Sequence, residues 1–373
     1  MKLAVYQPRV SYYVGGGEVV PLEHAKFLSR LSHQVTIVTT RASFINLSDY
    51  FLKFQKENTS IKIVFLDLPE ELKWIYDEKP GSRWIRWDYE SLRVGRLAFN
   101  YFLKNKFDLI AVHNYADLLA IPDGQKSVLH LHGYPEQSNY LHELLANIPT
   151  GFVADSKLIK NKWLRLAPIN QIKVATNGID ATYFKIQQRN LFKYDVLYVG
   201  RLIKTKGLFY LVDAIRLLSD LPLRVAIAAT GPEELALKMQ SKKLKLHNRI
   251  TFLGHVKDEL LPGLYSSSLM GVFPSYGREG IMTTMLENAA CGRPTITTTA
   301  CSMSEFLRDG YNGLLVKPKN SQDLASSIKR LYLDKRLANK LGAKARKSIE
   351  TSWSWPKKIK QVEKVYADIF NHH

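Results

Sequence analysis

The sequence predicts an α/β protein built from two doubly wound parallel-sheet domains. Its 373 residues fit two domains of ordinary size, since one domain takes roughly 100 to 200 residues. Short apolar runs that end in polar or small residues alternate with longer helical stretches along the whole chain. Such alternation is typical of parallel sheets covered by helices on both faces. A solenoid is excluded because no short-period repeat is visible.

Eleven apolar runs are expected to form strands. In the first half they are LAVYQP, QVTIVTT, IKIVFLDLP, DLIAVHN, SVLHLHG and GFVADS, and in the second half DVLYVGR, LRVAIAATG, RITFLGHV, LMGVFPS and RPTITTT. Helical stretches such as GLFYLVDAIRLLSD lie between them. Between the halves, KVATNGIDATYFKIQQRNLF contains turn residues and loses periodicity. We therefore expect one domain at residues 1–175 and a second at residues 176–355.

Composition and charge narrow the protein class. Hydrophobic residues make up 46% and charged residues 23% of the chain, as in ordinary globular proteins. We expect a soluble or peripheral protein, because no run reaches roughly 18 apolar residues. The chain has two cysteines, Cys291 and Cys301, without metal-ligand spacing, which favours a reduced, cytoplasmic setting. The net charge is +19, and residues 329–347 hold eight basic residues with one acid. That cluster either attracts polyanions or forms a solvated helix face.

Ligands bind parallel sheets at the carboxyl ends of the strands, which directs attention to four groups of residues. The first is Gly15 to Glu18, after the first predicted strand. Glycines let a backbone approach a phosphate closely, and the start of the following helix favours an anion. The full G-x-G-x-x-G spacing is missing, so a plain tight turn explains these glycines equally well.

The second group is GRLIKTKG, Gly200 to Gly207, after the strand DVLYV. Arg201 offers a planar fork of donors and Lys206 a point charge, and both suit phosphate oxygens. Two cations at a strand end, beside a glycine that opens a helix, are consistent with a diphosphate site. Exposed loop charges are the alternative.

The third group is SYGREGIMTTMLENAACGRP, which holds Glu279 in a strand-to-helix turn and Glu287 about two turns inside a helix. Carboxylates accept hydrogen bonds from hydroxyls, which suits a sugar or a ribose. The backbone N–H groups of residues 281–284 can donate to phosphate at the helix start. Without a ligand, the pair reads as a helix-start glutamate and an exposed one.

Histidines at strand ends form the fourth group. His113 ends DLIAVHN, and His130 and His132 end VLHLHG. Alternation places His130 and His132 on the same side of their strand unless Gly133 bends it. A histidine at a strand end is usually structural, but three near the expected ligand edge make one functional histidine an equally good reading.

Motifs in the second half resemble, in order, the nucleotide-sugar domain of glycosyltransferase family 4. The family comprises retaining group 1 glycosyltransferases of the GT-B fold, similar to glycogen synthase and mannosyltransferases. The motifs are ATNGID, VGRLIKTKG, ATGPE, ITFLGHV, FPSYGREGIMTTMLENAACGRPTI and SEFLRDGYNGLLVKP. The first half matches more loosely, through GGGE, LSHQVTI, VHN and HLHG.

The resemblance implies two Rossmann-like domains facing each other across a cleft that binds the donor. It also implies that residues 356–373 form a helix crossing back to the first domain. The catalytic residues it implies are His132, Arg201, Lys206 and Glu279. The donor-binding residues it implies are Gly16, Gly17, Gly200, Gly231, Gly280, Ile281, Met282, Thr283 and Glu287. His113 and Tyr134 are candidates on the acceptor side.

The resemblance also assigns separate roles within the donor site. Arg201 and Lys206 would hold the diphosphate, Glu279 would contact the transferred sugar, and Glu287 would accept from the ribose hydroxyls. No D-x-D occurs in the sequence, so we expect neither a metal nor a cofactor. Met282 stands where the family usually has a glycine. Ala300 and Cys301 replace another glycine pair, and these departures leave the donor sugar open.

The expected function is transfer of a hexose from a UDP- or GDP-sugar to a glycan or lipid-linked acceptor. A basic, aromatic stretch at residues 83–106 would lie on an anionic membrane surface, or pack as an ordinary helix on the first sheet. Two alternatives keep the nucleotide site: a non-catalytic nucleotide-sugar-binding protein and a GT-B epimerase. Nucleic acid is not expected as a partner, since no recognised motif accompanies the positive charge.

Overall fold

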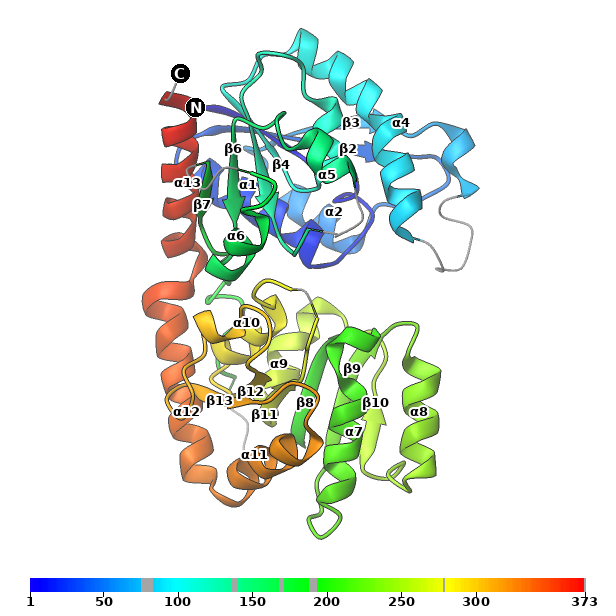
Figure 1. The fold of residues 1–373 in the computed structure, drawn as a ribbon, viewed down its shortest axis with the longest axis vertical. Helices are drawn as coiled ribbons and strands as arrows, with labels where there is room; N and C mark the ends of the chain where they lie inside the picture. The colour runs from blue at the N-terminus through cyan, green and yellow to red at the C-terminus, as the bar shows by residue number, and fades with distance from the viewer. Residues whose placement is uncertain (75–82, 136–139, 168–170, 188–192, 278, 372–373) are drawn as a thin grey trace. The chain divides into compact units, whose positions relative to one another are not determined.

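The computed structural model describes residues 1–74, 83–135, 140–167, 171–187, 193–277 and 279–371. The chain divides into two compact units, drawn in Figure 1. The first unit comprises residues 1–176 and 358–373, and the second comprises residues 177–357. This division falls between Thr176 and Asn177, beside the expected boundary. Each unit is a parallel sheet flanked by helices.

In the described part of the first unit, seven parallel strands run in the order β3-β2-β1-β4-β5-β6-β7. The strands are β1 (Lys2–Tyr6), β2 (Gln34–Arg41), β3 (Lys62–Asp67), β4 (Leu109–Val112), β5 (Ser127–Leu131), β6 (Gly151–Ala154) and β7 (Ile172–Val174). The helices are α1 (Gly16–Arg30), α2 (Asp49–Glu57), α4 (Arg83–Lys104), α5 (Tyr140–Leu145), α6 (Lys157–Trp163) and the final helix α13 (Trp355–Asn371).

The described part of the second unit has six parallel strands in the order β10-β9-β8-β11-β12-β13. They are β8 (Tyr194–Arg201), β9 (Val225–Thr230), β10 (Ile250–Phe252), β11 (Ser268–Phe273), β12 (Thr295–Thr298) and β13 (Gly313–Val316). The α-helices are α7 (Leu208–Leu217), α8 (Glu234–Lys243), α9 (Leu261–Ser266), α10 (Thr283–Ala290), α11 (Ser321–Leu333) and α12 (Lys335–Ser348). A short 3₁₀ helix, η3 (Lys204–Lys206), precedes α7.

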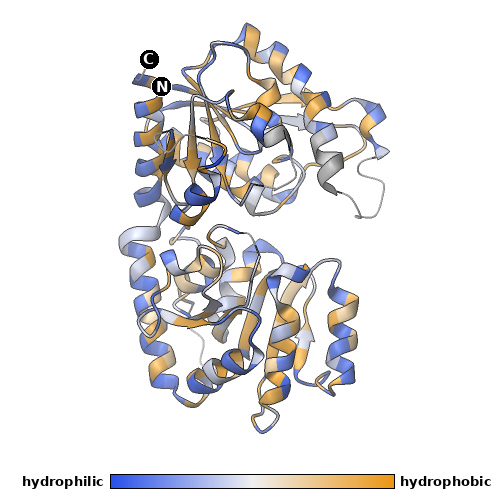
Figure 2. Ribbon diagram, viewed as in Figure 1, coloured by the Kyte–Doolittle hydropathy of each residue, from blue (hydrophilic) through white to orange (hydrophobic). Residues whose placement is uncertain are grey.

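Burial on both faces explains why the central strands are apolar almost throughout. Every residue of β4, β5, β6, β11 and β12 is buried. Figure 2 shows hydrophobic strands within each unit and helices that carry hydrophilic residues on one side. Continuous apolar runs are what sheets covered on two faces require. The sequence pattern therefore predicts these strands directly.

Strand order reverses once in each sheet, and the reversal decides where a ligand site can form. In the first unit the change lies between β1 and β4, and in the second it lies between β8 and β11. Neighbouring connections leave toward opposite faces at such a point, which opens a crevice at the carboxyl ends of the two strands. The glycine segment follows β1, and the Arg201–Lys206 segment follows β8.

Two strands escaped the sequence prediction, and one helix begins earlier than expected. β7 and β13 contain three and four residues, and the sequence reading assigned no strand to either. Both lie at a sheet edge. Gly16 and Gly17 form the start of α1, with Gly15 as the residue before it, instead of a separate loop.

Helix α4 forms most of the segment 83–106 that is also a candidate for membrane contact, and one side of this helix packs on the core of the first unit. Val94 is fully buried, and Tyr101 packs against the core of the first unit. Leu92 and Leu103 are exposed on this helix. The side chains of residues 83–88, including both tryptophans of the predicted segment, lie outside the described residues.

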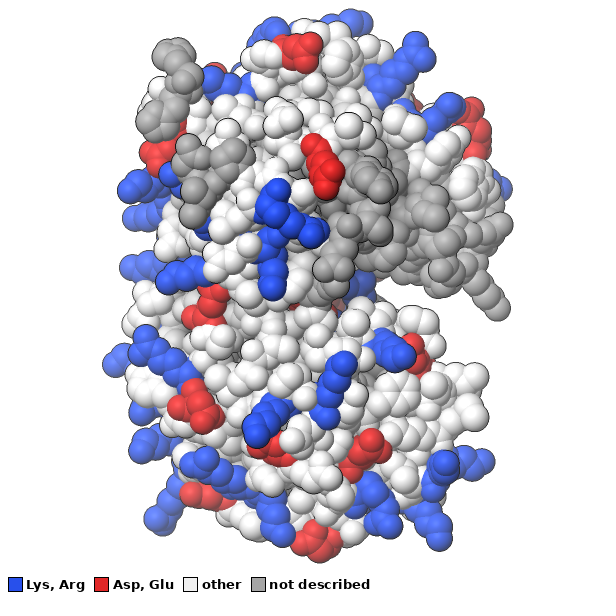
Figure 3. All heavy atoms as spheres, viewed as in Figure 1, with Lys and Arg blue, Asp and Glu red and all other residues white. Residues whose placement is uncertain are grey.

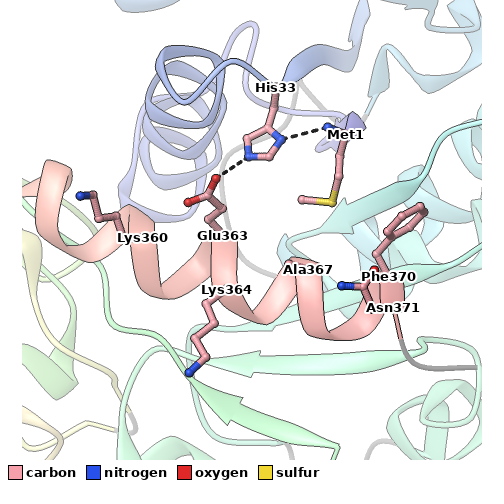
Figure 4. A pocket seen from close by; sticks show the side chains of 8 residues that line it. All are labelled: Met1, His33, Lys360, Glu363, Lys364, Ala367, Phe370 and Asn371. Carbon is pink, nitrogen blue, oxygen red and sulfur yellow. Dashed lines mark hydrogen bonds and ion pairs between the residues drawn. The ribbon is translucent and has the colours of Figure 1, made fainter.

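The final helix α13 packs against the first unit through buried and polar contacts. Tyr366 is fully buried, and its hydroxyl lies 2.7 Å from His130 Nε2 on β5. His33 Nε2 lies 2.9 Å from Glu363 Oε1, and Lys126 Nζ donates to the carbonyl of Phe370. Figure 4 shows a shallow groove beside α13, where His33 bridges Glu363 and the amino group of Met1.

The surface of the second unit carries much of the positive charge. Figure 3 shows Lys and Arg side chains gathered along the edge where α12 lies. Arg346 is a structural member of the 329–347 cluster, because its guanidinium donates to the carbonyls of Ala181, Phe184 and Ala290. In the described part of the chain, no helix combines the length and apolar character that crossing a membrane requires.

Gly207 joins the β8 segment to the end of β11, and its replacement tests that junction. Gly207 has φ 74°, and a Cβ there would lie 2.1 Å from the carbonyl oxygen of Pro274. Gly207→Ala should lower the free energy of unfolding by on the order of 3 kcal/mol, through strain and backbone displacement. Chemical denaturation measures this loss.

Gly254→Ala is the matched control, because Gly254 has φ 67° and open space around its Cβ position. Only the left-handed backbone conformation is penalised there, at about 1 kcal/mol. Equal losses in the two variants would show that the Pro274 contact does not constrain the fold.

Candidate functional site

The segment after β8 brings two cations to the point where the second sheet reverses its strand order. Arg201 ends β8 with an exposed side chain and forms no ion pair among the described residues. The Tyr198 hydroxyl donates to the Arg201 carbonyl at 3.0 Å and fixes the local backbone. Lys206 follows one turn later, and Gly207 then opens α7. Arg201 is thus available to an anion in solution.

Lys206 is held by Glu279, which reaches it from the segment after β11. The Lys206 side chain is only 11% exposed, and its ammonium forms an ion pair and hydrogen bond with Glu279 Oε2. The sulfur of Met282 lies 3.5 Å from the same nitrogen. A buried ammonium requires an anionic partner, because transfer out of water is costly for an unpaired charge. Glu279 supplies that partner.

Backbone contacts tie the two segments together around this ion pair. The Tyr276 N–H donates to the Thr205 carbonyl at 2.9 Å, and Ser275 Oγ donates to the same carbonyl at 3.1 Å. Ser275 Oγ also lies 3.3 Å from Glu279 Oε1. The Cys301 thiol donates to the Gly277 carbonyl at 2.6 Å. The carboxylate is therefore oriented by its neighbours and not by Lys206 alone.

Helix α10 follows directly and leaves its first backbone N–H groups available. Met282 precedes the helix and offers no side-chain cap, so the N–H groups at Thr283 and Thr284 lack an intrahelical partner. Gly280, Ile281 and Met282 are buried. In the place where the resembled family has a glycine, the Met282 side chain thus packs against the Lys206 ammonium.

Glu287 lies about one turn inside α10, where the sequence reading placed it two turns inside, because α10 begins only at Thr283. Its Oε2 accepts a 2.7 Å hydrogen bond from the Tyr265 hydroxyl on α9. Burial raises the pKa of Glu287 to about 7, against the opposing effect of the Tyr265 hydrogen bond. The residue as a whole is only partly buried.

Two glycines shape the strand ends next to these groups. Gly231 follows β9 with φ 156°, and a Cβ there would lie 2.5 Å from the Leu202 carbonyl oxygen. At Gly200, with φ 154°, a Cβ would lie 2.7 Å from the Tyr198 hydroxyl. Both positions therefore require glycine for the segment after β8 to keep its path. Their predicted donor-binding role remains a prediction.

Four histidines gather in the first unit behind the ends of β4 and β5. His113 Nδ1 lies 3.0 Å from His132 Nε2, and the two rings are parallel within 9°. The His130 ring stacks on His113 with centroids 4.4 Å apart. His24, from α1, lies 4.9 Å from the His130 ring. His24, His113 and His130 are buried, whereas His132 is partly exposed.

Burial keeps these imidazoles uncharged. It lowers the pKa of His132 to about 4 and that of His24 to about 3. Desolvation also lowers the pKa of His113 and His130 well below the ordinary value. At neutral pH each ring therefore carries one proton, and each hydrogen bond among them has one donor and one acceptor.

The remaining predicted residues of the first unit lie apart from these hydrogen bonds. Gly17 is exposed, and a Cβ there would meet nothing within 4 Å. Tyr134 is half-buried, and Lys162 Nζ lies 5.4 Å from its ring centre. His113 is buried behind His132, a place that favours a supporting role over contact with an acceptor.

Sequence reasoning missed several residues that complete these groups: His24, Tyr265, Ser275 and Tyr366. One signal was available for His24, which lies four residues after Val20 and four before Leu28. Both neighbours are buried core residues on the inner face of α1. A histidine at this spacing faces the core. Nothing in the local sequence around Tyr265 or Tyr366 indicates a polar partner.

Two family models match the chain, one in each half. Residues 14–183 match the model described as Glycosyltransferase Family 4, and residues 180–348 match the model described as Glycosyl transferases group 1. Together they include every site residue that the sequence predicted. The second match contains the Lys206–Glu279 pair and the whole of α10.

Individual relatives agree with these models. An uncharacterized glycosyltransferase of Methanocaldococcus jannaschii is 29% identical over 53% of this chain and 54% of the relative. The match thus spans about half the length of that relative. The N-acetyl-alpha-D-glucosaminyl L-malate synthase of Bacillus anthracis is 22% identical over 95% of this chain and 94% of its own length.

A solved structure extends the likeness to the whole fold. HepE of Anabaena, crystallised in complex with UDP and glucose, matches 98% of this chain and 99% of its own with a TM-score of 0.78. Sequence identity is 19%, so this likeness concerns the fold. Both units of the chain thus follow the architecture of that protein.

The buried Glu287 carboxylate should lower the free energy of unfolding at neutral and alkaline pH. Its folded-state pKa is raised from 4.5 to about 7, so the ionised carboxylate costs folding free energy. That cost is absent below the unfolded pKa, grows between the two values, and is complete above pH 7. Glu287→Gln should therefore raise the melting temperature at pH 8 and change it little at pH 4.5.

Glu259→Gln is the control, because Glu259 is exposed in the same unit. It should show no such pH-dependent gain. A Glu287→Gln variant that melts below the parent at pH 8 would contradict the assigned burial cost.

Proposed function

Because glycosyltransferase family models match both halves of the chain and the fold has two Rossmann-like domains of the GT-B type, we propose that it is a hexosyltransferase. The donor is a UDP- or GDP-sugar, and the acceptor is a hydroxyl of a glycan or of a lipid-linked molecule. The transfer retains the anomeric configuration and needs no metal. The Lys206–Glu279 pair beside Arg201, at the reversal point of the second sheet, is the observation that carries this proposal.

In this proposal, the Lys206–Glu279 ion pair belongs to the site before the donor binds. A bound diphosphate offers oxygens that compete with Glu279 for the buried ammonium of Lys206, while Arg201 contributes a second cation. When phosphate replaces Glu279 at Lys206, the carboxylate becomes available to accept hydrogen bonds from the hydroxyls of the transferred sugar. One side chain thus neutralises the empty site and orients the substrate in the filled one.

The chemistry fits this arrangement. Cleavage of the bond between the anomeric carbon and the diphosphate develops positive charge on the sugar ring and negative charge on the leaving oxygen. Fixed cations at Lys206 and Arg201 stabilise that negative charge in the transition state. They also substitute for a metal at the diphosphate. N–H groups at the start of α10 donate to phosphate, and Glu287 accepts from the ribose hydroxyls.

Met282 and a solved structure of similar fold indicate which donor to test first. Met282 is buried and contacts the ammonium where a glycine is usual, so it narrows the space for the transferred sugar. HepE was solved with UDP and glucose, which makes UDP-glucose the first donor to test. The acceptor hypothesis rests on the basic surface along α12 and on exposed Leu92 and Leu103 of α4, which favour an anionic membrane surface.

A ligand screen tests the proposal. UDP, GDP and ADP, each with its common sugars, should be compared for their effect on the melting temperature, because ligands that bind the folded state raise it. We expect one nucleotide to stabilise the chain and its sugar form to be hydrolysed slowly, with NMR showing the retained anomer. Nucleotide binding without any turnover of its sugar form would indicate a binding protein, and an epimerised sugar would indicate an epimerase.

Glu279→Gln should separate binding from chemistry. Turnover should fall by roughly 10²-fold or more, because the sugar loses an orienting carboxylate whose effect is comparable to that of one transition-state contact. UDP should bind as tightly as before or more tightly, because Lys206 no longer has an internal anion. Steady-state kinetics and UDP titration measure the two effects.

The matched control is Glu234→Gln, which breaks the partly exposed Lys238–Glu234 pair on α8. Both UDP affinity and turnover should stay at the parent level. Unchanged transfer in Glu279→Gln would remove Glu279 from the site.

Donor binding should also depend on pH through Glu287. Its pKa of about 7 means that the carboxylate is protonated below neutrality and accepts ribose hydroxyl bonds less well. The kcat/KM for the donor, which reports the free enzyme, should therefore fall as pH drops through 7. Glu287→Gln should flatten this dependence, and a flat profile in the parent would contradict the ribose assignment.

A further inference from the structure

The histidine group of the first unit contains more buried imidazoles than the proposed transfer uses. His132 is the partly exposed member, and His24, His113 and His130 lie behind it. One nitrogen from each of the three buried rings lies within 4.8 Å of the others. Two explanations suit such a group: a metal site, or a hydrogen-bonded stack that supports His132.

Ring geometry decides between them. His113 and His130 are stacked with centroids 4.4 Å apart and planes within 10° of parallel. A metal ion lies close to the plane of each imidazole that ligates it. Two stacked, nearly parallel rings cannot both direct a lone pair at one ion unless the stack is broken. The group is therefore organised by stacking and hydrogen bonding.

The contact between His113 and His132 fixes where protons reside. His113 Nδ1 and His132 Nε2 are 3.0 Å apart, and both rings are neutral, so one nitrogen donates and the other accepts. If His113 accepted at Nδ1, its only proton would be on Nε2. That atom is buried and has no hydrogen-bond partner in the described part of the chain. A buried N–H without an acceptor is the rarer arrangement in proteins, so donation from His113 Nδ1 is favoured.

We propose that His113 is a positioning residue that holds His132 in the tautomer protonated at Nδ1. His113 donates to His132 Nε2, so the single proton of His132 must be on its other nitrogen. His132 Nδ1 has no partner among the described residues, and the side chain is partly exposed. His132 therefore presents an N–H donor to an oxygen of the transferred sugar and is not a general base. The identity of that substrate rests on the proposed function.

His130, His24 and the Tyr366 hydroxyl of α13 hold the His113 ring in place. His130 stacks on the face of His113, and its Nε2 bonds the Tyr366 hydroxyl at 2.7 Å. His24 lies against both rings, with centroids 5.4 Å from His113 and 4.9 Å from His130. Rotation of His113 away from His132 would break this stack. The stacked rings thus hold His113 in the orientation in which its Nδ1 faces His132.

Long-range ¹H–¹⁵N NMR of the full chain with ¹⁵N-labelled histidine tests the tautomer directly. The His132 signals are assigned by their loss in His132→Gln. We expect a protonated Nδ1 and a bare Nε2 in the parent, and a shift toward protonated Nε2 in His113→Phe, which keeps a ring but cannot donate. His24→Leu, which alters the stack but keeps the His113 hydrogen bond, should retain the parent tautomer. A protonated Nε2 in the parent would overturn the proposal.

Kinetics with a rescue variant provides the second readout. His113→Phe should lower kcat at least tenfold, on the order of the loss of one oriented donor, with unchanged UDP affinity. His113→Asn should recover most of kcat, because its amide N–H can donate in place of Nδ1. Equal losses in both variants would overturn the positioning role. If the parent neither binds nucleotides nor transfers sugar, the proposed function fails, while the NMR result still decides the tautomer.

Discussion

The ion pair between Lys206 and Glu279 is the interaction on which the second unit's site depends. Lys206 is almost fully buried at the end of β8, and a buried ammonium without a counter-charge would destabilise the fold. The segment that carries Glu279 is joined to Thr205 by hydrogen bonds from the Tyr276 N–H and the Ser275 hydroxyl to the Thr205 carbonyl. Under the proposed function, a phosphate of the donor would satisfy the ammonium as Glu279 does.

Both units apply one topological rule with different chemistry. In the second unit the Arg201–Lys206 segment and Glu279 follow β8 and β11, where the strand order reverses, and in the first unit the candidate residues follow β1, β4 and β5. The second unit places cations and carboxylates there, which suits a charged donor. The first unit places neutral histidines there, which supply directed hydrogen bonds.

The sequence predicts the central strands well because burial on both faces leaves a continuous apolar run, as in β8 and β11. It also selects Lys206 and Glu279 separately, but their pairing is not readable, since the two residues are 73 positions apart and meet only through strand order. His24 is hidden within the apolar face of α1, and the missed strands β7 and β13 are short strands at sheet edges. The partners of Glu287 and His130, Tyr265 and Tyr366, likewise depend on packing between distant segments.

Calorimetric titration of UDP and GDP into the parent chain, Lys206→Ala and Lys204→Ala tests the central claim most directly. Lys204 lies in the same segment but is exposed, so it controls for the loss of one positive charge. We predict saturable one-to-one binding of one nucleotide to the parent, at least tenfold weaker binding in Lys206→Ala, and affinity within about threefold of the parent in Lys204→Ala. Equal weakening in the two variants, or no binding of either nucleotide to the parent, would contradict the account.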